Sequence, residues 1–281
     1  MNIKCINGFA LTDAKIININ DKATEAIVDN NEVKKVGITM SVVIPVLQEE
    51  KILEKHLTIL KDFQSKFGFE IIVSDGGSTD ETVAIAKKYA DKVIVHTGEK
   101  RQTIAEGRNM GAKAASSDIL VFLNGDSIPV DCESFFTAII DFSQKRGKYA
   151  RFSALACKVS SFPEEELLKD RIFYAIHNNY VWFLNIIGLG MGRGECQIIR
   201  KEVFEAVGGF NDKIIAGEDF DLYHRISKVA KIKYDPIISV HESPRRFRKY
   251  GYIRTITIWL INSMSVWWFG KSFSREWETV R

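Results

Sequence analysis

The chain has 281 residues, of which 46% are hydrophobic and 27% are charged, and its net charge is +3. A chain of this length and composition can form a sizeable core without disulfide bonds or structural metals. The net charge is too small to indicate a nucleic-acid partner. The four cysteines lie far apart and form no C-x-x-C pair, which argues against a zinc site or a disulfide framework. Such cysteines are typical of reduced thiols in a cytosolic protein.

The start of the chain predicts no targeting segment. The opening residues lack the apolar core of a signal peptide, and no stretch reaches the roughly 20 apolar residues that cross a bilayer. Residues 1–39 are rich in Asn, Asp and Lys and alternate only weakly, so we expect an N-terminal extension with short strands, for example at 14–20 and 25–30.

Residues 40–129 alternate between apolar strands and helices with apolar residues at helical spacing. The expected strands are 40–46, 69–77, 91–97 and 118–126, and the expected helices are 49–67, 78–90 and 102–116. This alternation predicts βαβ units and a parallel sheet. Ligands of such sheets bind beyond the carboxyl ends of the strands, here at 45–49, 74–78 and 124–126.

Beyond Pro129 the regular alternation breaks down. We expect a helix near 131–146, a strand pair at 148–161, an aromatic helix within 164–190, a strand and helix in 194–210, a helix at 217–230 and a strand at 231–243.

The buried strand ILVFL ends in Asn124-Gly125-Asp126. Asn, Gly and Asp tolerate the backbone angles of a turn, so a simple turn explains them. Alternatively, the two polar side chains hold a cation at the carboxyl end of the sheet. His241, at the end of a late strand, could complete an octahedral Mg²⁺ or Mn²⁺ site with Asp126 and phosphate oxygens, although a lone histidine is more often structural.

The segment VSDGGSTDET places Asp75 at the exit of another buried strand. A capped strand-to-helix turn explains the glycines and the hydroxyl residues that follow it. It leaves the Asp75 carboxylate unexplained, and the N–H or O–H groups of a nucleobase or ribose would be suitable partners. No Walker motif and no G-x-G-x-x-G fingerprint is present.

Three carboxylates, Glu218, Asp219 and Asp221, crowd the start of one predicted helix. The helix dipole favours anions there, so an N-terminal cap explains them. A catalytic carboxylate is the alternative, because a pair of nearby acids can raise one pKa toward that of a general base. Arg101 and Arg108 lie between two strand ends, where they could meet a diphosphate or form a solvated helix face.

The ordered segments VVIPVLQEE, EIIVSDGGSTDET, GRNMGA, LVFLNGDS and GGFNDKIIAGEDFDL resemble family 2 glycosyltransferases of the GT-A fold. The resemblance covers about residues 40–243. It implies a Rossmann-like, mostly parallel mixed sheet flanked by helices, and transfer of a sugar from a nucleotide donor, most often UDP-linked, to an acceptor hydroxyl or a lipid phosphate.

The resemblance also implies residue roles. Donor-binding positions would be Pro45, Leu47, Glu49, Asp75, Arg108, Asn124 and Asp126. The family's D-x-D acids hold Mn²⁺ or Mg²⁺ on the diphosphate, but this chain has Asn-Gly-Asp, so only Asp126 matches the acidic pattern. The second acid of the family's E-D pair is the catalytic base, which makes Asp219 the expected base beside Glu218.

A basic stretch at 245–254 precedes the uncharged stretch 255–270, which is rich in Trp and Ile. It predicts an amphipathic C-terminal helical segment. This segment either packs on the catalytic domain or lies on an anionic membrane surface, with tryptophans at the interface. The expected location is therefore cytoplasmic, with peripheral contact to the inner face of a membrane.

The resulting domain prediction is an extension (1–39), a catalytic domain (40–244) and the C-terminal segment (245–281). The catalytic domain divides into a nucleotide-binding half (40–129) and an acceptor half (130–244). Two other functions compete with glycosyl transfer: a nucleotide-sugar-binding protein that has lost turnover, and a sugar-1-phosphate nucleotidyltransferase. The latter class opens with a glycine-rich loop after its first strand, where this chain has PVLQEEK.

Overall fold

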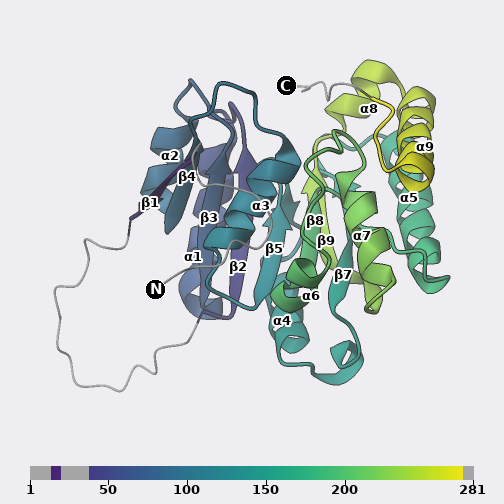
Figure 1. The fold of residues 1–281 in the computed structure, drawn as a ribbon, viewed down its shortest axis with the longest axis horizontal. Coiled ribbons are helices and arrows are strands. Elements are labelled where there is room, and N and C mark those ends of the chain that lie inside the picture. The colour runs from purple at the N-terminus through teal and green to yellow at the C-terminus, as the bar shows by residue number, and fades with distance from the viewer. Residues whose placement is uncertain (1–13, 20–37, 275–281) are drawn as a thin grey trace.

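The structure, a computed structural model, describes residues 14–19 and 38–274. Within these residues nine strands form one mixed sheet with helices on both faces (Figure 1). In spatial order the strands are β1 (Ala14–Asn18), β4 (Lys92–His96), β3 (Phe69–Asp75), β2 (Met40–Val46), β5 (Ile119–Leu123), β8 (Cys196–Arg200), β7 (Ala154–Ser161), β9 (Ile232–Glu242) and β6 (Ile128–Pro129). The predicted α/β class is confirmed, while the strand expected at 25–30 lies outside the described residues.

The helices follow the predicted order along the chain. They are α1 (Leu53–Phe67), α2 (Thr82–Tyr89), α3 (Ile104–Ala114), α4 (Cys132–Ser143), α5 (Leu168–Ile186), α6 (Lys201–Ala206), α7 (Glu218–Ser227), α8 (Arg245–Tyr250) and α9 (Tyr252–Phe269), with a 3-10 turn η3 (Gly147–Tyr149). Helices α1, α2 and α4 cover one face of the sheet, and α3, α6 and α7 cover the other.

The first half of the sheet is parallel, as the alternation predicted. Strands β2, β3, β4 and β5 run in the same direction, and β1 pairs antiparallel with β4 at the edge. Residues of β2, β3 and β5 are buried on both sides, which explains why their sequences are almost continuously apolar. Helix α3 packs closely on β2, because a Cβ atom on Gly111 would lie 2.2 Å from Val43 Cγ1.

The second half of the sheet mixes directions. Strand β8 runs antiparallel to β5 and β7, whereas β9 runs parallel to β7. The strand pair expected at 148–161 is wrong: this stretch contains η3 and the single strand β7. Its partner β9 comes from residues far along the chain, and a register shift follows Cys157. Such long-range pairing has no local sequence signal.

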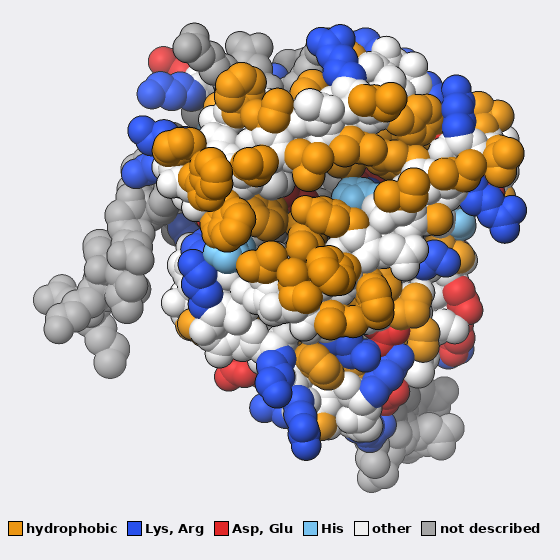
Figure 2. Space-filling view, turned by 90° about the vertical axis from the view of Figure 1, so that its right-hand side faces the viewer, with side chains coloured by type: hydrophobic (Ala, Val, Ile, Leu, Met, Phe, Trp, Pro, Cys, Tyr) orange, Lys and Arg blue, Asp and Glu red, His pale blue; other side chains and the backbone are white. Residues whose placement is uncertain are grey.

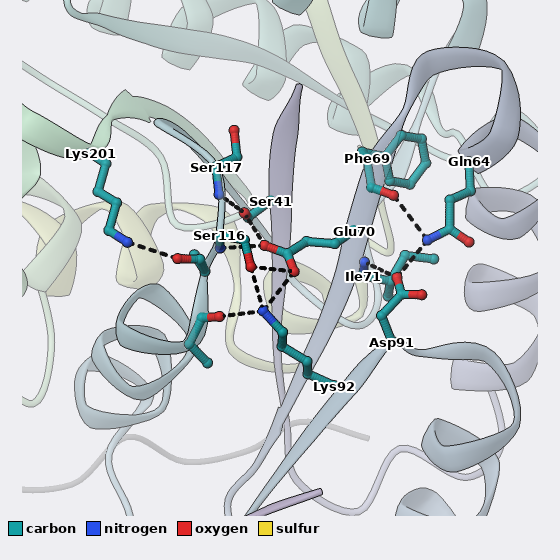
Figure 3. A network of polar contacts seen from close by, with 12 residues as sticks. Ser41, Gln64, Phe69, Glu70, Ile71, Asp91, Lys92, Ser116, Ser117 and Lys201 are labelled. Atoms are coloured by element: carbon teal, nitrogen blue, oxygen red, sulfur yellow. Dashed lines mark hydrogen bonds and ion pairs between the residues drawn. The ribbon is translucent and has the colours of Figure 1, made fainter. Parts of the chain in front are cut away.

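The amino end of the parallel sheet is held by a buried polar network (Figure 3). Glu70, at the start of β3, accepts hydrogen bonds from Ser41 Oγ (2.5 Å) and the Ser116 backbone N–H (2.5 Å). It also forms an ion pair with Lys92 Nζ at 2.8 Å. Burial raises the pKa of Glu70, but these partners outweigh burial, so its pKa lies below the ordinary value. The network links three parallel strands through one carboxylate.

The C-terminal segment is helical, as predicted, and α8 and α9 lie beside α5 at one end of the molecule (Figure 1). The buried carboxylate of Asp170 in α5 anchors both helices, because it pairs with Arg248 of α8 at 2.7 Å and accepts a hydrogen bond from the Tyr252 hydroxyl. In the described part of the chain, no helix is both long enough and apolar enough to cross a membrane.

Candidate active site

A pocket of about 460 Å³ opens at the carboxyl end of β5, between the sheet and helices α5, α7, α8 and α9. It brings together five of the residues predicted from the sequence: Arg108, Asn124, Asp126, Glu218 and Asp219. They come from three separate segments of the chain. The predicted nucleoside-binding positions Pro45, Leu47, Glu49 and Asp75 lie outside this lining, at the ends of β2 and β3.

Arg108 ties the two halves of the site together. Its side chain is only 1% exposed on α3. It donates hydrogen bonds to Asn124 Oδ1 (3.0 Å) and the Gly194 carbonyl (2.6 Å), and it pairs with Glu218 Oε1 at 2.9 Å. Its guanidinium also lies 5.1 Å from the centre of the Phe210 ring. Arg108 therefore fixes the positions of Asn124 and Glu218 and places positive charge behind them.

Helix α7 positions the expected catalytic base. The helix begins after Gly217, whose φ of +90° suits glycine. The three acids of its first turn differ in their partners. Asp221 pairs with Arg225 at 2.6 Å, and Glu218 pairs with Arg108. Asp219 accepts a hydrogen bond from the Phe220 backbone N–H at 2.8 Å and lines the pocket. Only Asp219 therefore presents a carboxylate to the pocket without an arginine partner, among the described residues of this turn.

The pKa of Asp219 is raised to about 7. Burial is the largest cause, followed by the negative charge of Glu218, and the Phe220 N–H and Arg108 only partly offset them. A Cβ atom on Gly194 would lie 3.6 Å from Asp219 Oδ2, so the absence of a side chain there keeps space beside this oxygen. A carboxylate with this pKa is suited to taking a proton near neutral pH.

The turn after β5 carries Asn124 and Asp126. Gly125 lies against β2, because a Cβ atom there would be 3.0 Å from Val46 Cγ1. Asn124 Oδ1 is engaged by Arg108, and Asp126 Oδ2 pairs with Arg245 of α8 at 2.9 Å. The Arg245 contact joins residues 119 positions apart and was not predicted from the sequence.

Asp75 closes β3 and is fully buried. Its Oδ2 accepts hydrogen bonds from the backbone N–H groups of Gly77 (3.0 Å) and Ser78 (2.8 Å), as in a capped turn. Its Oδ1 has no hydrogen-bond partner among the residues that the structure describes. A buried carboxylate oxygen without a partner is costly, by about 1–3 kcal/mol, so this atom is a candidate for contact with a ligand.

The other predicted nucleoside-binding residues surround this strand end. Pro45 pairs in register with Ser74, and the Gly76 backbone N–H donates to the Val46 carbonyl at 2.9 Å, which holds the ends of β2 and β3 together. The backbone N–H of Glu49 donates to Thr82 Oγ1 at 2.8 Å, so the loop that follows β2 is fixed on the start of α2. The roles of Pro45, Leu47 and Glu49 stay predictions.

The pocket also contains a charged cluster that the sequence did not reveal. Arg193, 2% exposed, pairs with Glu195 at 2.9 Å and with Glu242 at 3.2 Å. Burial raises the pKa of Glu242 well above its ordinary value, helped by the charge of Glu195. The pKa of Glu195 falls to about 2, because Arg193 outweighs the effect of burial. Glu195 and Glu242 share this one arginine, so the two carboxyls titrate as a coupled pair.

His241 is not brought into this pocket. Its Nδ1 lies 3.1 Å from Ser160 Oγ and 2.8 Å from the Ser161 carbonyl, so the ring faces β7. Side chains alternate along a strand, and the next residue, Glu242, is the one that lines the pocket. This alternation was the signal that could have favoured Glu242 over His241. A metal ligand role for His241 stays a prediction that the geometry does not favour.

The side chains of the pocket that could bind a metal ion fit a divalent cation only in part. Among the described residues, no group of three or more His, Cys, Asp and Glu side chains is arranged to hold a metal ion. Mg²⁺ commonly binds through one or two carboxylates and completes its shell with substrate phosphates and water. Asp126 supplies one such carboxylate. The residues therefore fit a cation that is shared with a bound diphosphate.

Solved structures with this fold were found by structural comparison. A mannosyltransferase from Pyrobaculum calidifontis, in complex with GDP-Man and Mn²⁺, matches with a TM-score of 0.60 and 17% identity over 81% of this chain and 62% of that chain. TarS from S. aureus in complex with UDP matches with a TM-score of 0.52 and 20% identity over 79% of this chain and 65% of that chain. The GT-A part of the fold prediction is confirmed by these neighbours.

Sequence relatives cover different parts of the chain. A validoxylamine A glucosyltransferase from Streptomyces hygroscopicus subsp. limoneus is 35% identical over 30% of this chain, but the match spans only 20% of that protein. A dolichyl N-acetyl-alpha-D-glucosaminyl phosphate 3-beta-D-2,3-diacetamido-2,3-dideoxy-beta-D-glucuronosyltransferase from Methanococcus voltae is 25% identical over 75% of this chain and 69% of that protein.

The family model for glycosyl transferase family 2 matches residues 41–208, which is more than half of the chain. The match includes the ends of β3 and β5, which carry Asp75 and Asp126, and helix α3, which carries Arg108, and it stops before α7. This chain belongs to glycosyl transferase family 2.

Proposed function

We propose that this protein transfers a sugar from a nucleotide donor, a UDP-sugar, to an acceptor hydroxyl or lipid phosphate, with inversion at the anomeric carbon. The observation that carries the proposal is the convergence of Arg108, Asn124, Asp126, Glu218 and Asp219 in one pocket at the carboxyl end of the sheet. Solved relatives of the same fold hold GDP-Man or UDP, which supports a nucleotide-sugar donor.

Asp219 is the base of the proposed reaction. An acceptor hydroxyl has a pKa far above 7 and loses its proton as it attacks. Its oxygen bonds to the anomeric carbon, the bond from that carbon to the diphosphate breaks, and the proton goes to Asp219. General-base catalysis of this kind contributes about 10²–10⁴-fold to the rate. Glu218 contributes indirectly, because its charge raises the pKa of Asp219.

Asp75 and Arg108 are the proposed donor-binding residues with the firmest structural support. The unpartnered Oδ1 of Asp75 can accept a hydrogen bond from an N–H group of the base. Arg108 places a buried positive charge next to Asn124, at the strand end where the diphosphate would lie. Pro45, Leu47 and Glu49 form the loop beside Asp75.

Asp126 is the residue that would hold Mn²⁺ or Mg²⁺ together with the diphosphate. The cation would neutralise charge on the leaving diphosphate. Because Asp126 is paired with Arg245, it must release this arginine first. We therefore expect weak binding of Mn²⁺ to the protein alone and tighter binding with UDP, measured by isothermal titration. Tight binding without UDP would contradict this assignment.

We also propose that α5 and α9 contact the cytoplasmic face of an anionic membrane. Both helices expose large apolar side chains, and Figure 2 shows hydrophobic side chains gathered on this face with Lys and Arg along its edges. Residues 245–274 contain no Asp or Glu, which suits an anionic surface. Flotation with anionic and with neutral vesicles tests this, and absence of the protein from both floating fractions would rule it out.

Two other functions are less well supported. A binding protein without turnover rests only on Asn124, where the family usually has an acid, while Asp126 and Asp219 are both in the pocket. A nucleotidyltransferase would need a glycine-rich loop after β2, and this chain has PVLQEEK there.

A nucleotide-release assay tests the proposal. Purified protein is incubated with UDP-, GDP- and dTDP-sugars, each with Mn²⁺, Mg²⁺ or EDTA, and with Asp219→Asn as the control. Slow release from one donor that depends on the metal and on Asp219 is the expected result. Donor binding without release in any combination, even with a broad acceptor mixture, would favour the binding protein.

A further inference from the structure

The pocket that holds Asp219 continues into an apolar arm between α5 and α9. Helix α5 lines it with Phe173, Ile176, His177 and Tyr180, and helix α9 lines it with Ile256, Trp259, Leu260 and Ser263. In each helix these residues recur at i, i+3, i+4 and i+7, so each helix turns one face toward the arm. The arm is therefore built by two complete helix faces.

The arm is open at its outer end. Ile176, Ile256 and Leu260 all line the pocket and are all exposed, which means that the apolar lining continues to the molecular surface. The surface around this opening is the hydrophobic face of Figure 2. Trp259 packs deeper, with its ring 5.2 Å from His177 and 5.6 Å from Phe247. An apolar ligand could thus pass from the surface to the interior without crossing a polar barrier.

The inner end of the arm carries two neighbouring arginines. Arg245 and Arg246 of α8 both line the pocket, next to Phe247 at the apolar end and Asp126 at the polar end. The pKa of Arg246 is lowered, chiefly by burial. Two arginines at the junction of an apolar arm and a catalytic pocket suit a ligand with a long apolar part and an anionic group.

We propose that the apolar arm between α5 and α9 binds the single hydrocarbon chain of a lipid phosphate, with Arg245 and Arg246 at its phosphate, so that the hydroxyl that Asp219 deprotonates belongs to a lipid-linked acceptor. This inference rests on the proposed transfer function, of which it names the acceptor class. The whole pocket, of which the arm is one part, has a volume of about 460 Å³, within the range of roughly 300–1,000 Å³ typical of small-molecule sites. The arm opens on the basic-rimmed face, where such a lipid would reside.

Direct binding of farnesyl phosphate tests the inference without donor or metal. The comparison ligands are farnesol, which lacks the phosphate, dodecyl phosphate, which has a straight acyl-like chain, and inorganic phosphate. We expect farnesyl phosphate to bind about tenfold or more tightly than farnesol or inorganic phosphate. Tighter binding of farnesyl phosphate than dodecyl phosphate would identify an isoprenoid chain, and the reverse would identify an acyl chain.

Matched variants locate the site. Ile256 lines the arm and is 37% exposed, whereas Ile253 lies on the same helix outside the lining and is 83% exposed. Ile256→Trp should fill the arm and weaken farnesyl phosphate binding by about tenfold or more, and Ile253→Trp should leave it within about twofold. Leu260→Trp provides a second arm variant, and thermal unfolding identifies any variant that is not folded.

Arg246→Gln tests the phosphate end. It should weaken binding of farnesyl phosphate by about tenfold and leave binding of farnesol unchanged. The inference is overturned if farnesyl phosphate does not bind, if the Ile253 and Ile256 variants behave alike, or if farnesol binds as tightly as its phosphate. Nucleotide release by the wild type separates the two proposals: release without lipid binding would remove only the inference, and lipid binding without release would remove the transfer function.

Discussion

Each end of strand β3 carries a buried carboxylate, and the two carboxylates differ in their hydrogen-bond partners. Glu70, at the amino end, is surrounded by donors from Ser41, Lys92 and Ser116 (Figure 3). Asp75, at the carboxyl end, is as deeply buried, but only one of its oxygens is engaged within the described chain. The first carboxylate is complete without a ligand, and the second is not.

The difference shows how to separate structural acids from candidate binding acids in this fold. A buried polar group that lacks a partner costs stability, so such a group is expected where a ligand supplies the partner. The same contrast extends to helix α7, where Asp221 pairs with Arg225 and Asp219 keeps a raised pKa.

The largest expected effect is that of Asp219→Asn. The amide cannot accept a proton, so donor turnover should fall by about 10²–10⁴-fold, while UDP affinity and the unfolding midpoint stay close to wild type. Turnover, calorimetric UDP binding and thermal unfolding are measured on the same preparation. Asp221→Asn is the matched control on the same helix turn. Parallel loss of turnover and UDP binding in Asp219→Asn would assign Asp219 a structural role.

Asp75→Asn should be next in size. The amide oxygen can still accept from Gly77 and Ser78, so the turn is kept and only the outward atom changes from an acceptor to a donor. UDP affinity should fall by about 10–100-fold with an unchanged unfolding midpoint. Asp118→Asn, on an exposed residue at the opposite end of the sheet, is the control. Unchanged UDP affinity would remove Asp75 from the donor site.

Glu70→Gln should show the reverse behaviour. It removes the charge that Lys92 faces and should lower the free energy of unfolding by about 1–3 kcal/mol, without changing UDP affinity. Urea unfolding measures the first quantity and calorimetry the second. Glu133→Gln, in the exposed ion pair with Lys66, should change stability by less than about 1 kcal/mol. Equal effects of the two variants would mean that the Figure 3 network contributes no special stability.

The pH dependences should also separate the two ends, with smaller effects. Because the folded pKa of Glu70 lies below its ordinary value of 4.5, its stabilising effect is present above that value and is lost as pH falls through the folded pKa. Wild-type stability should therefore decline more steeply on acidification than that of Glu70→Gln. Donor turnover should instead rise as pH increases through about 7, where Asp219 loses its proton. A flat turnover profile across neutral pH would argue against Asp219 as the base.

Much of the first half of the fold could be predicted from the sequence. The runs 40–46, 69–75 and 119–123 are buried on both faces, so each run is apolar enough to stand out. The second half of the fold was harder to predict, because β7 pairs with β9 across more than seventy residues and no local sequence pattern specifies that register. The helices α8 and α9 were expected from composition, but their packing on Asp170 of α5 was not.

The candidate site was predictable where its residues follow a strand or open a helix. Asp75, Asp126 and Asp219 all occupy such positions. Arg193 and Glu195 were missed because they lie in a glycine-rich loop without regular structure, and only tertiary packing brings them to Glu242. His241 was preferred over Glu242 because its chemistry was more conspicuous than the alternation of the strand.

The position of α9 affects the order in which the nucleotide-binding residues and the catalytic base become functional during synthesis. This helix lies over the start of α7, since a Cβ atom on Gly217 would be 3.7 Å from Val266, and with Trp259 it closes the pocket around Asp219. A nascent chain that still lacks α9 already contains Asp75 and Arg108, but the pocket around its Asp219 lacks the wall that α9 supplies. Burial is the largest cause of the raised pKa of Asp219, so this pKa should be less raised before α9 is in place. Nucleotide recognition can therefore precede the synthesis of α9, whereas a base tuned to neutral pH has to await this helix.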